Sequence, residues 1–363
     1  MSRHHAVLAA LIILAAACSD KTPDTQTAAV SASSPAADSN EIPLHLPEQP
    51  FGAISLAASQ GGSIAYLFGA GDPPYLTIIG PSGDVVGRAG PRGQGPGELS
   101  GTGALVASGD AFLVADNARA TVLRFDAQSG TFLEETPYGT SAFVLGAVPD
   151  SLDIFDGEAP VRGGTAAIVR VAVATGQGRT LVPADDDVLR SATSSTNPTQ
   201  RHLIPPAYAT RDSTIAWGDG FRYRIQVKNG AAERVTITRD LPANSRGPRT
   251  IQLLTEALER AASGQGPGAK ENRERLDTLA REVVPHFGLG GIGFDTAGEL
   301  VVAGPVNDST FIDRFRGTAF VSRTIVDCFA PGRIAIGGGV VAMHCRARAD
   351  GDEPYRLRAF RLP

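Results

Sequence analysis

Histidine and carboxylate side chains are the groups in this sequence that could hold a catalytic metal. Four histidines lie beyond the first 17 residues: His45, His202, His286 and His344. No two of them have the spacing of paired metal ligands. The acidic run at 185–187 could bind Ca²⁺, but the glycine and the closing glutamate of a calcium-binding loop are missing. The sequence therefore predicts no metal and no other cofactor, and we interpret the acidic run as a solvated loop.

Four further aspartates lie at predicted turns: Asp116, Asp126, Asp219 and Asp295. An aspartate in a turn accepts hydrogen bonds from nearby backbone amides, so these residues need no catalytic role. A metal site would require three or more of them to converge on one point. The Gly-x-Ser-x-Gly pattern of a serine nucleophile is also absent from the sequence. We predict no catalytic residue.

Two cysteines near the end of the chain, Cys328 and Cys345, flank what the apolar pattern predicts to be adjacent strands of one sheet. We predict a disulfide bond between them. Closing a loop of this size would stabilise the fold by about 3 kcal/mol on a chain-entropy argument. Two buried free thiols are the alternative.

The third cysteine, Cys18, ends a segment with the order of parts of a secretory signal. Arg3 gives a charged start, residues 6–17 are apolar, and three alanines directly precede the cysteine. This apolar stretch is shorter than the roughly 20 residues that a transmembrane helix needs. A cleaved leader is therefore favoured over a permanent anchor helix.

The stretch that ends at Cys18 resembles the lipobox of bacterial lipoproteins, with Ala15 standing where leucine is commonest. The resemblance implies a lipoprotein signal peptide at 1–17 and acylation of Cys18. It also implies a lipid-anchored protein of the cell envelope, and Ser19 favours the outer membrane. Ordinary cleavage that leaves a free Cys18 is the alternative.

Residues 18–48 are predicted to be a disordered linker. Ser, Ala, Pro, Asp and Thr dominate this segment, and almost no large apolar residue precedes Ile42. Such a composition cannot bury enough apolar surface to offset the entropy lost on ordering. We expect the linker to hold the folded region away from the membrane.

The folded region, 49–363, is predicted to be all-β. The chain has 42 Gly and 25 Pro, so turns are abundant, and one large β domain or two smaller ones would fit its length. The formal net charge is −5. Basic residues do not cluster with aromatic ones, so the electrostatic pattern of nucleic-acid binding is missing.

One sequence pattern recurs through this region: a polar turn, an apolar strand, a second turn and an alternating strand. The clearest copy covers 108–133, where Gly109-Asp110 and Ser129-Gly130 mark hairpin turns. Five weaker copies occupy 63–86, 149–182, 211–237, 294–321 and 334–360.

Six four-stranded units spaced by about 40–50 residues predict a six-bladed β-propeller. The last copy is short of one strand, so we expect its outermost strand to come from the region between Ile42 and Leu56. Two stacked β-sandwiches are the alternative, but they would not explain the regular spacing.

A glycine-rich phrase lies at 90–99, with the sequence Gly-Pro-Arg-Gly-Gln-Gly-Pro-Gly-Glu-Leu. It resembles the Gly-x-Gly-Pro-Gly-Glu-Phe segment of NHL-like six-bladed propeller lipoproteins in bacteria. The resemblance implies this fold more than any activity. The phrase could also cradle a phosphate, but no Gly-Lys-Ser/Thr follows it and no helix begins there. We interpret it as a loop between blades.

A helical hairpin is predicted over 249–285, between the fourth and fifth blades. Apolar residues recur at helical spacing in two runs, and the glycine-rich stretch 263–268 separates them. Insertions of this kind lie on one face of a propeller, often the binding face. A helical pair that covers exposed strand edges is the alternative.

Two functions from different classes remain. In the favoured one, the propeller is a monomeric binding or scaffold module for a protein, peptide or glycan of the envelope. In the other, it is a metal-dependent hydrolase or lyase of the lactonase kind, with a metal in the central channel. The position of the aspartates at turns favours the binding module.

Overall fold

The computed structural model describes residues 40–47, 53–68, 75–101, 103–137, 143–156, 167–193, 206–263, 267–346 and 355–362. These residues form six separate four-stranded sheets. The predicted signal peptide (1–17), Cys18 and the linker up to residue 39 lie outside the described residues. The linker predicted over 18–48 extends too far, because Glu41 and Ile42 form a strand and Ile42 is buried.

The first three sheets, or blades, follow one another along the chain. They contain β2 (Ala53–Ala58), β3 (Ile64–Phe68), β4 (Leu76–Ile79) and β5 (Val85–Ala89); β6 (Leu105–Ser108), β7 (Ala111–Asp116), β8 (Thr121–Asp126) and β9 (Phe132–Pro137); and β10 (Phe143–Val148), β11 (Ser151–Asp156), β12 (Ala167–Ala172) and β13 (Gly178–Val182).

The remaining three blades have the same antiparallel order. They contain β14 (Ala207–Arg211), β15 (Thr214–Asp219), β16 (Arg224–Asn229) and β17 (Val235–Thr238); β18 (Ile292–Phe294), β19 (Leu300–Val306), β20 (Ser309–Arg316) and β21 (Ala319–Val326); and β22 (Phe329–Gly337), β23 (Val340–Arg346), β24 (Tyr355–Arg361) and β1 (Glu41–Ile42).

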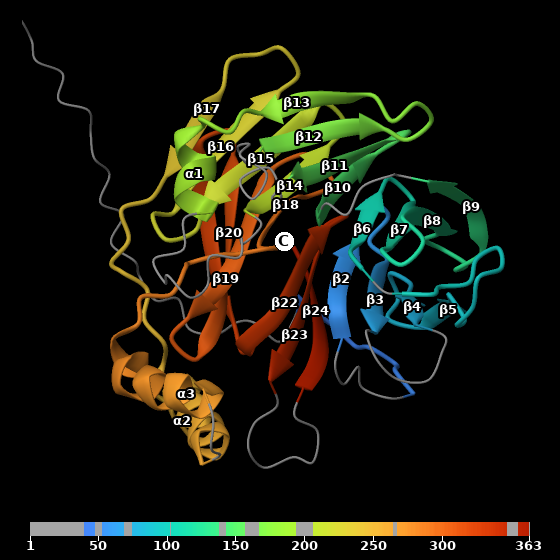
Figure 1. Ribbon diagram of the computed structural model, residues 1–363. Coiled ribbons are helices and arrows are strands. Elements are labelled where there is room, and N and C mark those ends of the chain that lie inside the picture. The colour runs from blue at the N-terminus through green and yellow to red at the C-terminus, as the bar shows by residue number, and fades with distance from the viewer. Residues whose placement is uncertain are drawn as a thin grey trace, which may run out of the picture. The chain divides into compact units, whose positions relative to one another are not determined.

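The six blades close into a ring. Each innermost strand contacts the innermost strand of the next blade, from β2 through β6, β10, β14 and β18 to β22, and β22 contacts β2 again. Figure 1 shows these strands around the central opening. The prediction of a six-bladed propeller is confirmed, and the alternative of two stacked sandwiches is wrong.

Both ends of the chain build the last blade, as predicted. β1 pairs antiparallel with β24, and Ile42 lies opposite Ala359. We expected this strand to come from the region between Ile42 and Leu56, and the structure places it at the start of that region, at Glu41–Ile42. Leu56 lies instead in β2, the inner strand of the first blade.

The hydrophobic core lies between the blades. The described residues form six buried apolar clusters, one at each junction of neighbouring blades. Strands in the middle of a blade are covered on both faces, so all six residues of β7 are buried, whereas no residue of the outermost strand β9 is. Continuous apolar runs are typical of strands that are buried on both faces.

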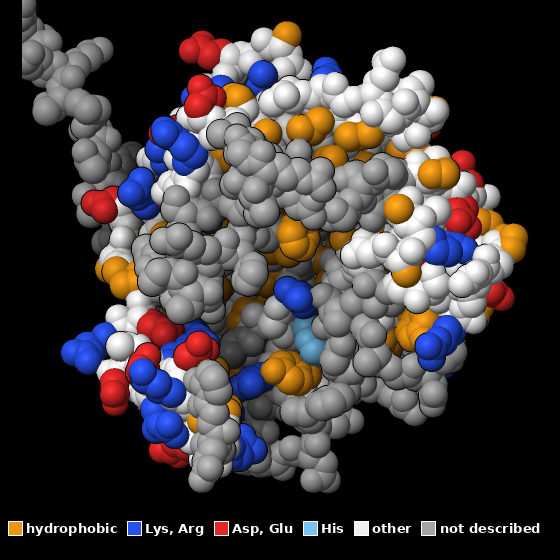
Figure 2. Space-filling model, viewed as in Figure 1, with side chains coloured by type: hydrophobic (Ala, Val, Ile, Leu, Met, Phe, Trp, Pro, Cys, Tyr) orange, Lys and Arg blue, Asp and Glu red, His pale blue; other side chains and the backbone are white. Residues whose placement is uncertain are grey.

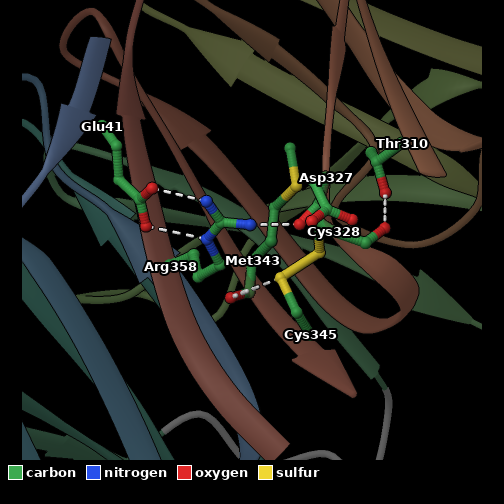
Figure 3. The surroundings of a disulfide bond; sticks show 7 residues. All are labelled: Glu41, Thr310, Asp327, Cys328, Met343, Cys345 and Arg358. Atoms are coloured by element: carbon green, nitrogen blue, oxygen red, sulfur yellow. Dashed lines mark hydrogen bonds and ion pairs between the residues drawn. A yellow bond between two sulfur atoms is a disulfide. The ribbon is translucent and has the colours of Figure 1, made fainter. Parts of the chain in front are cut away.

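An arginine and a disulfide bond hold the closing blade together (Figure 3). The guanidinium of Arg358 on β24 donates to the Glu41 carboxylate on β1, with Nε 2.7 Å from Oε1, and to the backbone carbonyl of Asp327. Cys328 and Cys345, the cysteines that we expected to pair, are bonded in the structure. The bond joins the chain before β22 to β23, within one blade.

The helical insertion lies where the sequence predicts it, between β17 and β18. It contains α2 (Pro248–Ala262), α3 (Pro267–Thr278) and a 3₁₀ turn, η2 (Leu279–Arg281). The two helices pack against each other. No helix in the described part of the chain is long and apolar enough to cross a membrane.

A carboxylate from the fifth blade caps the start of α2. The N-cap residue is Gly247, which has no side chain to cap the helix. Asp308, in the turn between β19 and β20, accepts hydrogen bonds from the backbone amides of Arg249 (3.1 Å) and Thr250 (3.0 Å). A Cβ atom at position 247 would collide with this carboxylate. Glycine is therefore required for the docking of the hairpin.

The acidic run at 185–187 is not the solvated loop that we expected. Asp186 is buried and caps the short helix α1 (Asp187–Thr193), accepting a hydrogen bond from the Leu189 amide at 2.8 Å. It also accepts from the indole of Trp217 (3.0 Å) and pairs with Arg234. The carboxylate thus joins α1 to the fourth blade.

Candidate binding channel

A channel of about 410 Å³ runs between the innermost strands, and all six blades contribute to its wall. Small and apolar residues dominate this wall, for example Ala57, Ala107, Ala209 and Gly293. Figure 2 shows hydrophobic side chains in the hollow at the middle of the visible face. The channel is therefore large enough for a small ligand, since ligand pockets occupy about 300–1,000 Å³.

The position of the inner strands explains the wall. Each one is the end strand of its sheet, so one of its edges has no partner within the blade. Small side chains let neighbouring inner strands come close: a Cβ atom at Gly146 would lie 2.8 Å from Thr210 Cγ2. Ser55 bridges one such gap, where its hydroxyl accepts a hydrogen bond from the Leu105 amide at 3.2 Å.

The two ends of the channel differ. We call the end at which the inner strands begin the front mouth; it is lined by Asn117, Phe143, Leu289 and Arg333. The opposite end, the rear mouth, is lined by Gln60, Pro149, Arg211 and Asp212.

The front mouth combines apolar exposure with one arginine. Phe143 is 55% exposed and Leu289 is 49% exposed, although both are large apolar residues. Arg333 is exposed as well, and within the described part of the chain it forms no ion pair. An exposed aromatic side chain beside an apolar hollow is a feature of interaction sites.

The arginine at the rear mouth has a structural task. Arg211, at the end of β14, donates hydrogen bonds to the backbone carbonyls of Asp295 and Thr296, the latter at 2.8 Å. These bonds join the fourth blade to the fifth. Asp212 lies 4.0 Å from the Arg211 guanidinium, so the two charges at this mouth largely offset each other.

A buried network of charges ties the third blade to the fourth. The Arg170 guanidinium on β12 makes two parallel hydrogen bonds to the Asp153 carboxylate on β11, at 2.6 and 2.7 Å. It also donates to the hydroxyl of Thr210, and Tyr208 donates to Asp153 at 2.6 Å. Donation of these hydrogen bonds to Asp153 raises the pKa of Arg170. Burial, and then Asp153, raise the pKa of the Tyr208 hydroxyl, which therefore keeps its proton.

A second network lies between the fourth and fifth blades. The buried Asp313 carboxylate accepts from Arg323 at 2.6 and 2.7 Å, from Arg239 at 2.7 Å and from the Tyr223 hydroxyl at 2.5 Å. His286 lies beside Tyr223, with ring centres 5.8 Å apart. Burial, and then Arg323 and Arg239, lower the pKa of His286 although Asp313 opposes this. Two cations share one carboxylate here.

The four aspartates at turns act as backbone caps, as predicted. Asp116 accepts from the amides of Ser100 (2.7 Å) and Ala118 (3.0 Å). The other three accept from amides two to four residues further along the chain: Asp126 from Gln128 and Ser129, Asp219 from Phe221, and Asp295 from Glu299. Among the described residues, no three His, Cys, Asp or Glu side chains gather as metal ligands.

The histidines are likewise dispersed. His45 is exposed and pairs with Asp84, with Nδ1 2.8 Å from Oδ1. His286 and His344 are buried in different blade junctions, and the ring of His344 stacks on Tyr355 at 4.7 Å. His202 lies outside the described residues.

The glycine-rich phrase is a loop between the first and second blades, as predicted. The Glu98 carboxylate folds back into it and accepts a hydrogen bond from the Gly95 amide at 2.7 Å. A Cβ atom at Gly93 or Gly95 would meet this carboxylate. Its own glutamate occupies the concave face that a phosphate would need.

Comparison with known proteins supports the fold. No protein-family model matches the chain, and no curated protein matches it in sequence. A protein of Bacteroides fragilis whose name calls it exported is similar in structure, with a TM-score of 0.51, 14% identity and coverage of 90% of this chain and 96% of that one. A member of the DUF4221 family from Bacteroides vulgatus has a TM-score of 0.49, with 10% identity, 88% of this chain and 95% of that one. At 14% identity the similarity to the Bacteroides fragilis protein shows the fold alone.

Sequence reasoning missed two arginines, Arg170 in a blade junction and Arg333 at the channel wall. Arg170 interrupts the apolar strand Ala-Ile-Val-Arg-Val-Ala, and a charge in such a strand indicates a buried partner. Arg333 has no comparable signal. Its place at the front mouth depends on the register of β22, which shifts between Phe329 and Arg333.

Proposed function

We propose that this protein is a binding module of the bacterial cell envelope, and that the channel receives part of its ligand at the front mouth. The observation that carries this proposal is the apolar channel of about 410 Å³ with two large apolar side chains exposed at one end. A protein, peptide or glycan of the envelope would be the partner from which the bound group projects.

The insertion supports the choice of the front mouth. The segment that follows η2 passes beside the fourth blade, where the His286 amide donates to the Gly220 carbonyl at 2.9 Å. It then reaches the channel at Leu289 and Gly290. The part of the chain that departs most from the repeat therefore leads directly into the proposed site, which is where repeat proteins carry their specific binding features.

The location in the envelope rests on the N-terminal sequence. After cleavage of the leader at 1–17, the acylated Cys18 would anchor the protein, and the part of the predicted linker before β1 would let it reach its partner. The similar structure from Bacteroides fragilis bears a name that calls it exported, which agrees with this location. Intact mass of the protein purified from envelopes should include fatty acyl groups, and Cys18→Ala should lack them and be released from the membrane.

Binding of Nile red, a neutral apolar dye, tests the channel. We expect one saturable site in the mature full-length protein and at least a tenfold loss of affinity in the double variant Phe143→Ser/Leu289→Ser. The matched control is Leu133→Ser/Val321→Ser, which removes apolar residues of similar exposure from outer strands. If the control loses the dye and the mouth variant keeps it, the channel is not the binding site.

A further inference from the structure

We propose that the front mouth recognises a carboxylate attached to an apolar group, and that Arg333 is the residue that binds the carboxylate. This inference rests on the proposed function and adds the chemistry of the ligand to it. The ligand would be a free apolar acid or the C-terminal residue of a peptide.

The charges around the channel favour an anion. Among the described residues that line it, Asp212 is the only acid, and it belongs to the rear mouth, 4.0 Å from Arg211. The front mouth has Arg333 and no lining acid among those residues. An approaching carboxylate would therefore meet one positive charge that no described carboxylate offsets.

Arg333 differs from the arginines that stabilise the blades and their junctions. Arg170, Arg239, Arg323 and Arg358 all pair with carboxylates. Arg333 has no ion pair within the described residues and is exposed at the wall of an apolar hollow. A guanidinium can hold a carboxylate through two parallel hydrogen bonds, and the low polarity of the wall strengthens such a pair.

The local backbone is consistent with the placement of Arg333 at the mouth. β22 loses its register with β23 between Phe329 and Arg333, and regular pairing resumes from Arg333 onward. Irregularities of this kind often redirect a side chain next to a binding site. Here the residue at the end of the irregular stretch is the one that lines the channel.

The apolar part of the ligand would contact Phe143 and Leu289 at the mouth and then enter the channel. Ile334 and Val144, next to Arg333 and Phe143 in the chain, continue the apolar wall inward. The arrangement selects a molecule with a charged end and an apolar end. A sugar without an acid group has neither a charged end nor an apolar end, so it would bind neither the guanidinium of Arg333 nor the apolar wall.

Displacement of Nile red from the mature full-length protein tests the inference. One arm compares dodecanoate with dodecanol, and the other compares the peptide Ala-Ala-Phe carrying a free C-terminus with its C-terminal amide. We expect the acid to bind at least tenfold more tightly than its neutral counterpart in one arm, and that arm identifies the source of the carboxylate.

Arg333→Gln should lower the affinity for the acid to that of its neutral counterpart, while Arg333→Lys should keep part of the preference. The control is Arg222→Gln, an exposed arginine that does not line the channel. Equal affinity for acids and neutral compounds, or a preference that survives Arg333→Gln, would overturn the inference. If Nile red still binds at the mouth in those cases, the proposed function stands; if it binds nowhere in the channel, both fail.

Discussion

Arginine side chains have opposite surroundings at the junction between the fourth and fifth blades and at the front mouth. At the junction, Arg239 and Arg323 share the buried carboxylate of Asp313. At the mouth, Arg333 is exposed and forms no ion pair with any described residue. A buried cation requires a fixed anion, because removal from water is costly. An exposed cation can stay unpaired and bind a ligand instead.

The largest effect should come from removing the anion at the junction. Asp313→Ala leaves two half-buried guanidiniums without a carboxylate, and we expect the free energy of unfolding to fall by about 3–5 kcal/mol. Arg333→Ala should change it by less than about 0.5 kcal/mol, because the residue is exposed and unpaired. Urea unfolding of the mature protein measures both. Similar values for the two variants would remove the distinction between the regions.

The junction between the third and fourth blades offers a milder version of the same test. Asp153→Ala leaves one guanidinium without its carboxylate rather than two. We therefore expect the free energy of unfolding to fall by about 3 kcal/mol, the lower end of the range for a buried ion pair that loses one partner. The double variant Asp153→Ala/Arg170→Met replaces the remaining charge by an apolar chain of similar length. It should be more stable than Asp153→Ala alone; a double variant of equal or lower stability would contradict the account.

The carboxylate that docks the helical insertion should have a local effect only. Asp308→Ala removes the cap from α2, and such a loss costs about 1 kcal/mol. Amide hydrogen exchange should become faster in the first turn of α2 while the blades keep their protection. Glu259→Ala, an exposed substitution near the other end of α2, is the control. Faster exchange throughout the fifth blade would show that Asp308 supports more than the hairpin.

The fold could be predicted because its signals are local. A strand that is buried on both faces is a continuous apolar run, and a hairpin turn needs Gly or Asp at fixed places. The segment 108–133 contains both signals, so its strands and turns can be predicted from that segment alone. The helical insertion could be predicted for the same reason, since its apolar spacing differs from that of the strands around it. Cys328 and Cys345 could be paired because neighbouring strands place them together.

The full networks of charges could not be predicted, because each also includes residues of the neighbouring blade. Tyr223 and Asp313 lie 90 positions apart, and only the packing of the fourth blade against the fifth brings them together. Asp186 looks like part of an acidic surface loop until Trp217 and Arg234 are placed around it. Arg333 shows the same limit for the site: its role depends on a channel that no single segment forms.

The subtlest difference between the two regions should be a dependence on pH. Burial and the cations Arg323 and Arg239 lower the pKa of His286 in the folded protein, whereas in the unfolded chain the imidazole has its ordinary pKa of about 6.5. Between these two values the unfolded chain binds more protons. The free energy of unfolding should therefore be highest above about pH 7, fall as the pH decreases below that, and stop falling on this account below the folded pKa.

His286→Gln tests this dependence, because it removes the titrating group from the junction. Urea unfolding between about pH 7.5 and pH 5.5 should show a smaller loss of stability on acidification in this variant than in the wild type. His45→Gln, at an exposed position, should follow the wild type. If His286→Gln and the wild type lose stability in parallel, burial and the cations of the junction do not lower the pKa of this imidazole in the folded protein.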